Sequence, residues 1–195
     1  LWVKLENERE IAYQANYDLL TKLPNKYNFT QLLNDEISKA EQTCKFVGVI
    51  FIDVDDFKTV NDSVGHDSGD SILFQIANNL QDCIRPNDVL ARFGGDEFLI
   101  MIPQMDTVDT IRNIAERLTD SFRKSYIVKA QEFHLSASTG IAVYPNDGTD
   151  SELLIKNADL SMYQSKEKGK NRYTFCTEEM KAETIRKIRI VEDLH

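Results

Sequence analysis

Two acidic side chains stand at the point where a buried strand is expected to begin. In RFGGDEFLIMIP, residues 92–103, Asp96 and Glu97 directly precede the apolar run FLIMI. A carboxylate buried without a partner is strongly destabilising, so this pair must face water, a cation or a ligand. Gly94 and Gly95 let the backbone approach a ligand where a Cβ would clash. The stretch predicts a β-hairpin with a tight primed turn and a binding role at its tip.

A second acidic segment ends an earlier apolar run. Residues 46–52 are mostly β-branched or aromatic, which predicts a strand buried on both faces. Side chains alternate along a strand, so Asp53 and Asp55 share one face. If this strand lies beside the hairpin, Asp53 and Asp96 converge, and convergent carboxylates beside phosphates suit Mg²⁺. The alternative is a charged turn and a solvated strand end.

The remaining patterns predict the elements that position these acids. Apolar residues at helical spacing indicate helices, and short β-branched runs bounded by turn residues indicate strands. The resulting order is α-β-α-β-β-α-β-α-β. Because a hairpin is antiparallel, this order favours an α/β fold with a mixed central sheet flanked by helices. Beyond the hairpin, helices are expected over about 28–42, 67–85, 106–122 and 151–168, and strands over 46–52, 134–145 and 172–176.

Composition narrows the class of protein. The chain has 195 residues and a net charge of -9, which suits one well-cored domain and argues against a nucleic-acid binder. Three widely spaced cysteines indicate neither a disulfide framework nor a zinc site, and they fit a reducing cytosol. No apolar run approaches the roughly 20 residues of a membrane span. We therefore expect a soluble cytoplasmic domain, with anchoring of a parent protein in the inner membrane left open.

Five blocks of the sequence, in order over about residues 15–176, resemble the diguanylate cyclases. Their GGDEF domains are named for the five letters found here at residues 94–98. DLLTKLPNKYNF resembles the family's opening D-x-L-T-x-L-P-N-R, with Lys26 in place of Arg. FIDVDDFKTVNDSVGHDSGDSIL is similar to its D-x-D-x-F-K block, and STGIAVYPNDG and ADLSMYQSKEKGKNRY resemble its last two blocks. Five ordered blocks are far more specific than one glycine-rich match.

The resemblance implies a nucleotidyl-cyclase or palm-like sheet and three segments. Residues 1–17 would be a connector helix from an upstream sensor domain. Residues 18–176 would be the GGDEF domain. Residues 177–195 would be a linker helix that leads toward a following domain, such as the phosphodiesterase EAL domain of tandem proteins.

By the same resemblance, the acids bind metal. Asp53 and Asp96, with the carbonyl of Val54, would hold two Mg²⁺ ions per site, for which Mn²⁺ would substitute. Glu97 would support the metal site or the attacking hydroxyl. Lys58 would act in catalysis together with Asp96 and Glu97, as a candidate cation for the triphosphate. Two metals suit attack of a ribose hydroxyl on an α-phosphate.

Other positions would bind the nucleotide. Asn61 and Asp70 match the pair that reads guanine, with a turn asparagine and a helix N-cap aspartate as the alternatives. Gly94 and Gly95 would make room for GTP. Two further lysines, Lys166 and Lys170, are expected on one helix face if that helix persists, where they would grip the β and γ phosphates. Lys170 stands where the family usually has Arg, so it lacks the bidentate fork, and a solvated helix end is the alternative.

Arg85 and Asp88 have the R-x-x-D spacing of the family's inhibitory product site. An arginine that stacks on guanine and pairs with phosphate suits a cyclic dinucleotide. A helix-ending arginine and a turn aspartate are the alternative.

The implied activity is that of a diguanylate cyclase. It would condense two GTP into cyclic di-GMP and two pyrophosphates at a homodimer interface, with feedback inhibition by the product. Two rival functions stay open. One is a weak or inactive module that binds GTP or cyclic di-GMP and controls an attached domain. The other is a different palm-like nucleotidyl transferase, from which Asn61 and Asp70 point away.

Overall fold

The computed structural model describes residues 10, 11 and 13–182, and its ordered elements fill most of that range. Helices alternate with strands, and one hairpin interrupts the alternation. In chain order the elements are α2 (Lys26–Thr43), β1 (Phe46–Val54), α3 (Phe57–Val64), α4 (His66–Asp82), β2 (Val89–Gly94), β3 (Glu97–Met105), α5 (Asp109–Ser121), β4 (Tyr126–Val128), β5 (Gln131–Phe133), β6 (Ala137–Tyr144), α6 (Ser151–Glu167) and β7 (Arg172–Phe175).

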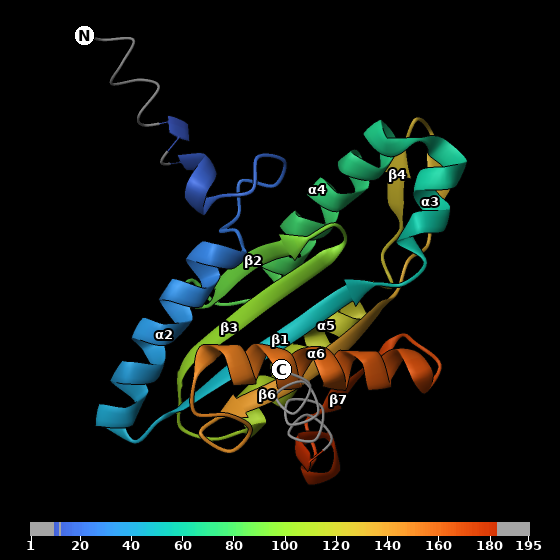
Figure 1. Ribbon diagram of the computed structural model, residues 1–195. Helices are drawn as coiled ribbons and strands as arrows, with labels where there is room; N and C mark the ends of the chain where they lie inside the picture. Colours follow the sequence, from blue (N-terminus) through green and yellow to red (C-terminus); the bar gives the residue numbers. More distant parts are fainter. Residues whose placement is uncertain (1–9, 12, 183–195) are drawn as a thin grey trace, which may run out of the picture.

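A mixed five-stranded sheet forms the centre, in the order β2-β3-β1-β6-β7 (Figure 1). Strand β1 pairs antiparallel with both β3 and β6, whereas β6 and β7 run parallel. The predicted mixed sheet with flanking helices is therefore confirmed. As a result of this order, the acidic end of β1 lies at the same end of the sheet as the β2–β3 turn.

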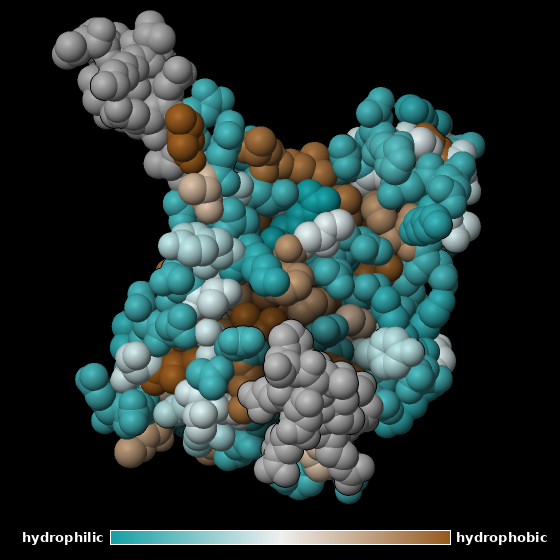
Figure 2. Space-filling view, in the orientation of Figure 1, coloured by the Kyte–Doolittle hydropathy of each residue, from teal (hydrophilic) through white to brown (hydrophobic). Residues whose placement is uncertain are grey.

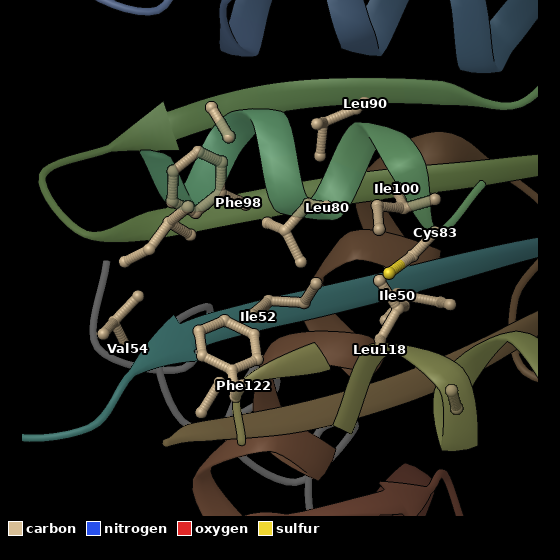
Figure 3. Close-up of a cluster of buried hydrophobic side chains, with 14 of the residues drawn as sticks. Ile50, Ile52, Val54, Leu80, Cys83, Leu90, Phe98, Ile100, Leu118 and Phe122 are labelled. Atoms are coloured by element: carbon tan, nitrogen blue, oxygen red, sulfur yellow. The ribbon is translucent and has the colours of Figure 1, made fainter. Parts of the chain in front are cut away.

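Alternating side chains of β1 build two separate cores, one on each face of the sheet. Ile50 and Ile52 are fully buried in the core that α4 and α5 cover (Figure 3). Val49 and Phe51 face the opposite core, which α2 and α6 cover. Each such side chain contributes about 1.5–3 kcal/mol when it leaves water. This double burial explains why the run is apolar at every position, and it fixes β1 as the rigid support of Asp53.

Some elements differ from the sequence expectation. Helix α3 was not expected, because it has only eight residues and Gly65, with φ +84°, separates it from α4. The β4–β5 hairpin was also not expected, since each of its strands has three residues. Helix α4 ends at Asp82, a turn before the expected end near Arg85, where the Cys83 N–H bonds the carbonyl of Leu80.

The two ends of the chain are described only in part. Residues 10, 11 and 13–16 are helical, and the rest of the expected connector helix lies outside the described residues. Residues 178–182 are also helical, whereas 183–195 of the expected linker lie outside them. Within the described part, no helix combines the length and apolar character that crossing a bilayer requires.

Candidate active site

The acidic end of β1 meets the β2–β3 turn through backbone pairing. Asp53 is the register partner of Glu97, and the N–H of Val54 donates to the carbonyl of Asp96 at 3.2 Å. Gly94 pairs with Glu97, so Gly95 and Asp96 alone form the turn, and Gly95 has φ +49°. A positive φ at the first turn residue is the reason for a glycine there. The expected convergence of the two acidic segments is confirmed.

Burial and mutual repulsion disfavour the charged forms of the carboxylates in this cluster. The pKa of Asp53 is raised by burial, against the opposing effect of Lys166, and Asp96 adds to the rise. The pKa of Glu97 is raised by burial and then by the charges of Asp53, Asp159 and Asp96. A bound cation would relieve this repulsion because it neutralises several carboxylates at once.

The donor set fits a magnesium ion that is shared with a substrate. Among the described residues, no three His, Cys, Asp or Glu side chains form a preassembled metal cage. Mg²⁺ usually takes only one or two carboxylates from the protein and completes its shell with water and phosphate oxygens. Asp53 and Asp96 supply that number at one strand end, and hard oxygen donors are what the ion prefers.

The two lysines expected on one helix face are separated. Lys166 lies in the last turn of α6, and its Nζ is 2.8 Å from a carboxylate oxygen of Asp53. The helix ends at Glu167, so it does not persist to Lys170, which has φ +62° in the following loop. There the Lys170 Nζ is 2.7 Å from Asp56, and this hydrogen bond raises the pKa of the lysine. Both ammonium groups nevertheless remain close to the end of β1.

The expected guanine-reading pair lies on two packed helices. Asn61 lies within α3 and Asp70 within α4, so neither is a turn residue or an N-cap as the alternatives required. The helices meet at Gly69, where an added Cβ would lie 1.8 Å from the Asn61 amide oxygen. Gly69 therefore leaves room for Asn61 beside the exposed Asp70. Lys58 is exposed on α3, and hydrophilic side chains dominate the surface over that helix (Figure 2).

Arg92 supports the turn, a role that the sequence did not reveal. Its guanidinium donates to the carbonyl of Gly95 at 3.0 and 2.7 Å, and to the carboxylate of Asp18 at 3.1 and 3.2 Å. Asp18 also accepts from the backbone and hydroxyl of Thr21. Because Asp18 and Arg92 are 74 residues apart, no local pattern could have indicated this pairing.

Asp159 is a second residue that the sequence analysis missed. It lies on α6 two turns before Lys166, whose charge opposes the rise in the Asp159 pKa, and the charge of Asp159 in turn raises the pKa of Glu97. Burial raises the pKa of Asp159. The seven-residue spacing to Lys166 was a usable signal, because residues two helical turns apart share a face.

Arg85 and Asp88 line a separate hollow on the far end of β3. Its volume is about 910 Å³, and Lys39 and Glu36 of α2 contribute to its wall. The carboxylate of Asp88 accepts the Arg85 N–H at 2.8 Å, and burial raises the pKa of Asp88. This bond holds Asp88 and leaves the Arg85 side chain exposed.

Comparison with known proteins identifies close resemblances. Residues 15–172 match the family model described as diguanylate cyclase, GGDEF domain. The chain is 37% identical over 186 residues to the bifunctional diguanylate cyclase/cyclic di-GMP phosphodiesterase MucR of Pseudomonas aeruginosa, covering 95% of this chain and 27% of MucR. It is 33% identical over 184 residues to the cyclic di-GMP phosphodiesterase NbdA of the same organism, covering 94% of this chain and 23% of NbdA.

A solved structure of the isolated GGDEF domain of YfiN from Pseudomonas aeruginosa superposes with a TM-score of 0.82. The two are 29% identical, and the match covers 90% of this chain and 99% of that one. The chain spans about a quarter of the length of MucR and NbdA. The similarity to MucR and NbdA therefore concerns only one part of each of those proteins.

Proposed function

Because this chain belongs to the GGDEF family of diguanylate cyclase domains, we propose that it condenses two GTP molecules into cyclic di-GMP and two pyrophosphates. The observation that carries this proposal is the pairing of Asp53 with Glu97, which brings Asp96 to the same strand end beside Lys166. Carboxylates next to an ammonium group suit a metal-bound triphosphate, since one binds the metal and the other the phosphates.

The acids hold and orient the reacting groups. Asp53 and Asp96, with the carbonyl of Val54, would hold two Mg²⁺ ions, or Mn²⁺ in their place. When bound, such ions lower the pKa of a ribose 3′-OH and neutralise charge on the attacked phosphate and the pyrophosphate. Glu97 would support the metal site or orient the attacking hydroxyl. Positioning and charge neutralisation together account for most catalysis of phosphoryl transfer.

Nucleotide recognition is assigned to α3, α4 and the end of α6. Asn61 and Asp70 would read the guanine edge, since an aspartate accepts from N1–H and N2–H and an amide complements the rest. Lys166 and Lys170 would bind the β and γ phosphates after they leave Asp53 and Asp56, and Lys58 would assist. Gly94 and Gly95 carry no side chains, and the space beside them is open, which would leave room for GTP to approach the start of the turn.

The proposed condensation of two GTP molecules requires two copies of the chain. Each copy presents one GTP, and each 3′-OH attacks the α-phosphate held by the other. An upstream sensor domain could then regulate activity through the helix that ends near Tyr17, by setting how two domains face each other. An EAL domain is the proposed downstream neighbour. We place the domain in the cytoplasm, where GTP is present.

Arg85 and Asp88 are the proposed site of product inhibition. The hollow beside them has room for a guanine base, and the exposed Arg85 can stack on that base and pair with a phosphate. Lys39 lies on the same wall and adds positive charge.

The deciding experiment joins two copies of the chain through a dimeric coiled coil fused upstream, and measures cyclic di-GMP formed from GTP and Mg²⁺. Product formation that requires both the forced dimer and the metal is the expected result. A forced dimer that binds GTP tightly and forms no product would refute the enzymatic proposal.

The same outcome would support the second candidate, a regulatory module that binds GTP or cyclic di-GMP. The observation in its favour is the similarity to NbdA, which is named a phosphodiesterase although this GGDEF-like segment is part of it. In such a protein the domain would bind a nucleotide and control its neighbour.

A further inference from the structure

A carboxylate beside the proposed metal site is almost completely buried, and its hydrogen-bond partners are two serines and a backbone N–H. Asp55 follows the end of β1 and is 4% exposed, compared with 8% for Asp53. Its two oxygens accept hydrogen bonds from the hydroxyl of Ser136 at 2.6 Å, the hydroxyl of Ser138 at 2.7 Å and the N–H of Asn171 at 3.1 Å. A buried carboxylate is tolerated only with such partners. Because its oxygens are already engaged, Asp55 is not free to bind a ligand directly.

The bond to Asn171 reaches the loop between α6 and β7. Gly169, Lys170 and Asn171 have φ angles of +106°, +62° and +48° in succession. For residues other than glycine this conformation costs on the order of 1 kcal/mol or more, and it persists only where the surroundings enforce it. The Asn171 N–H on Asp55 and the Lys170 N–H on the carbonyl of Ser165 provide that enforcement.

The same loop follows one of the two lysines that would bind the triphosphate and contains the other. Lys166 precedes it at the end of α6 and pairs with Asp53, whereas Lys170 lies within it. Two acids on the end of one strand therefore hold both sides of the loop: Asp53 through Lys166, and Asp55 through Asn171. The second attachment remains when Lys166 moves to a phosphate.

We propose that Asp55 is a positioning residue for triphosphate binding, which fixes the α6–β7 loop to the end of β1 and so sets where Lys166 and Lys170 stand relative to Asp53. This inference rests on the proposed function, because it assigns the two lysines to the phosphates of GTP. Asp55 itself touches no substrate. It acts through the backbone of Asn171 and through the two serines that complete its hydrogen bonds.

The test measures binding and does not depend on turnover. The full chain is titrated with a non-hydrolysable GTP analogue and, separately, with GMP, which lacks the β and γ phosphates. Asp55→Ala is expected to weaken binding of the analogue about tenfold, the loss of roughly one charge-assisted contact, and to leave GMP binding unchanged. Asp55→Asn is expected to stay close to the wild type, since an amide can accept from Asn171 and donate to a serine hydroxyl.

Two results would overturn the inference: wild-type affinity for the analogue in Asp55→Ala, or equal weakening of both nucleotides, which a purely structural role would produce. If Asp55→Ala does not fold, the Ser136→Ala and Ser138→Ala variants take its place under the same criteria. Asp120→Ala, which removes an exposed partner of Arg123, is the matched control. A wild-type chain that binds neither nucleotide would refute the proposed function itself, and the role of Asp55 would fall with it.

Discussion

Arg92→Met tests whether one arginine holds the β2–β3 turn to the rest of the domain. The substitution keeps an apolar stem of similar length and removes the guanidinium. Two sets of contacts are lost together: the donation to the Gly95 carbonyl at 3.0 and 2.7 Å, and the ion pair with Asp18. The first supports the turn that carries Asp96, and the second ties it to the segment preceding α2.

The expected loss of stability follows from the burial of these contacts. The side chains of Arg92 and Asp18 are 12% and 23% exposed. The free energy lost on breaking this ion pair therefore lies between the value for exposed pairs, about 0–1 kcal/mol, and the value for buried pairs, about 3–5 kcal/mol. A hydrogen bond from a charged donor to Gly95 adds about 1.5–3 kcal/mol. We expect Arg92→Met to lower the free energy of unfolding by about 3 kcal/mol, or the melting temperature by about 6–12 °C.

Chemical denaturation of the wild type and the variant measures this difference. Arg123→Met is the matched control, because its partner Asp120 is 63% exposed and the arginine is 82% exposed. The control is expected to change stability by less than about 0.5 kcal/mol. If both variants lose the same small amount, the reasoning about the Arg92 contacts is refuted. Combining Arg92→Met with Asp18→Asn should give less than the sum of the two single effects.

The pH dependence of stability provides an independent measurement. Burial raises the pKa of Asp18, but hydrogen bonds from Thr21 and then from Arg92 outweigh it and hold the pKa below its usual value. The charged carboxylate thus stabilises the folded state above the unfolded pKa of about 4, and this contribution is lost as pH falls through the folded pKa. In Arg92→Met the loss on acidification is expected to be smaller. An identical acid profile for both proteins would contradict the assignment.

Three further substitutions test the proposed site. Asp96→Asn is expected to abolish formation of cyclic di-GMP in the forced dimer while costing less than about 1 kcal/mol of stability; an unfolded variant would indicate a structural role instead. Arg85→Ala is expected to relieve inhibition by the product without changing the initial rate, and an unchanged inhibition constant would remove the assignment of that hollow. Gly69→Ala places a Cβ 1.8 Å from the amide oxygen of Asn61, so this amide must move. Displacing the amide is expected to lower GTP affinity. Stability should change little, because alanine favours a helix by about 1 kcal/mol over glycine and this gain offsets the displacement. Unchanged binding would argue against a guanine contact by Asn61.

Local patterns predicted most of the elements, and they failed where the signal was short. The apolar run of β1 and the glycine-acid turn were predicted because burial and turn conformation depend on a few adjacent residues. Helix α3 was missed because its eight residues, although amphipathic, make only about two turns before Gly65 ends the helix. Lys166 and Lys170 were expected on one helix face because they are four residues apart. Helix α6 ends at Glu167, so only Lys166 lies on it.

The sequence by itself determined which chemical groups are present and on which kind of element each one lies. The positions of the acids, at the end of a strand and in a hairpin turn, could be predicted from the neighbouring residues alone. The tertiary structure decided the partners: Arg92 with Asp18 across 74 residues, and Asp55 with Asn171 across 116. These contacts depend on the order β3-β1-β6-β7 of the sheet, and strand order arises from long-range packing that leaves no periodic signal along the chain.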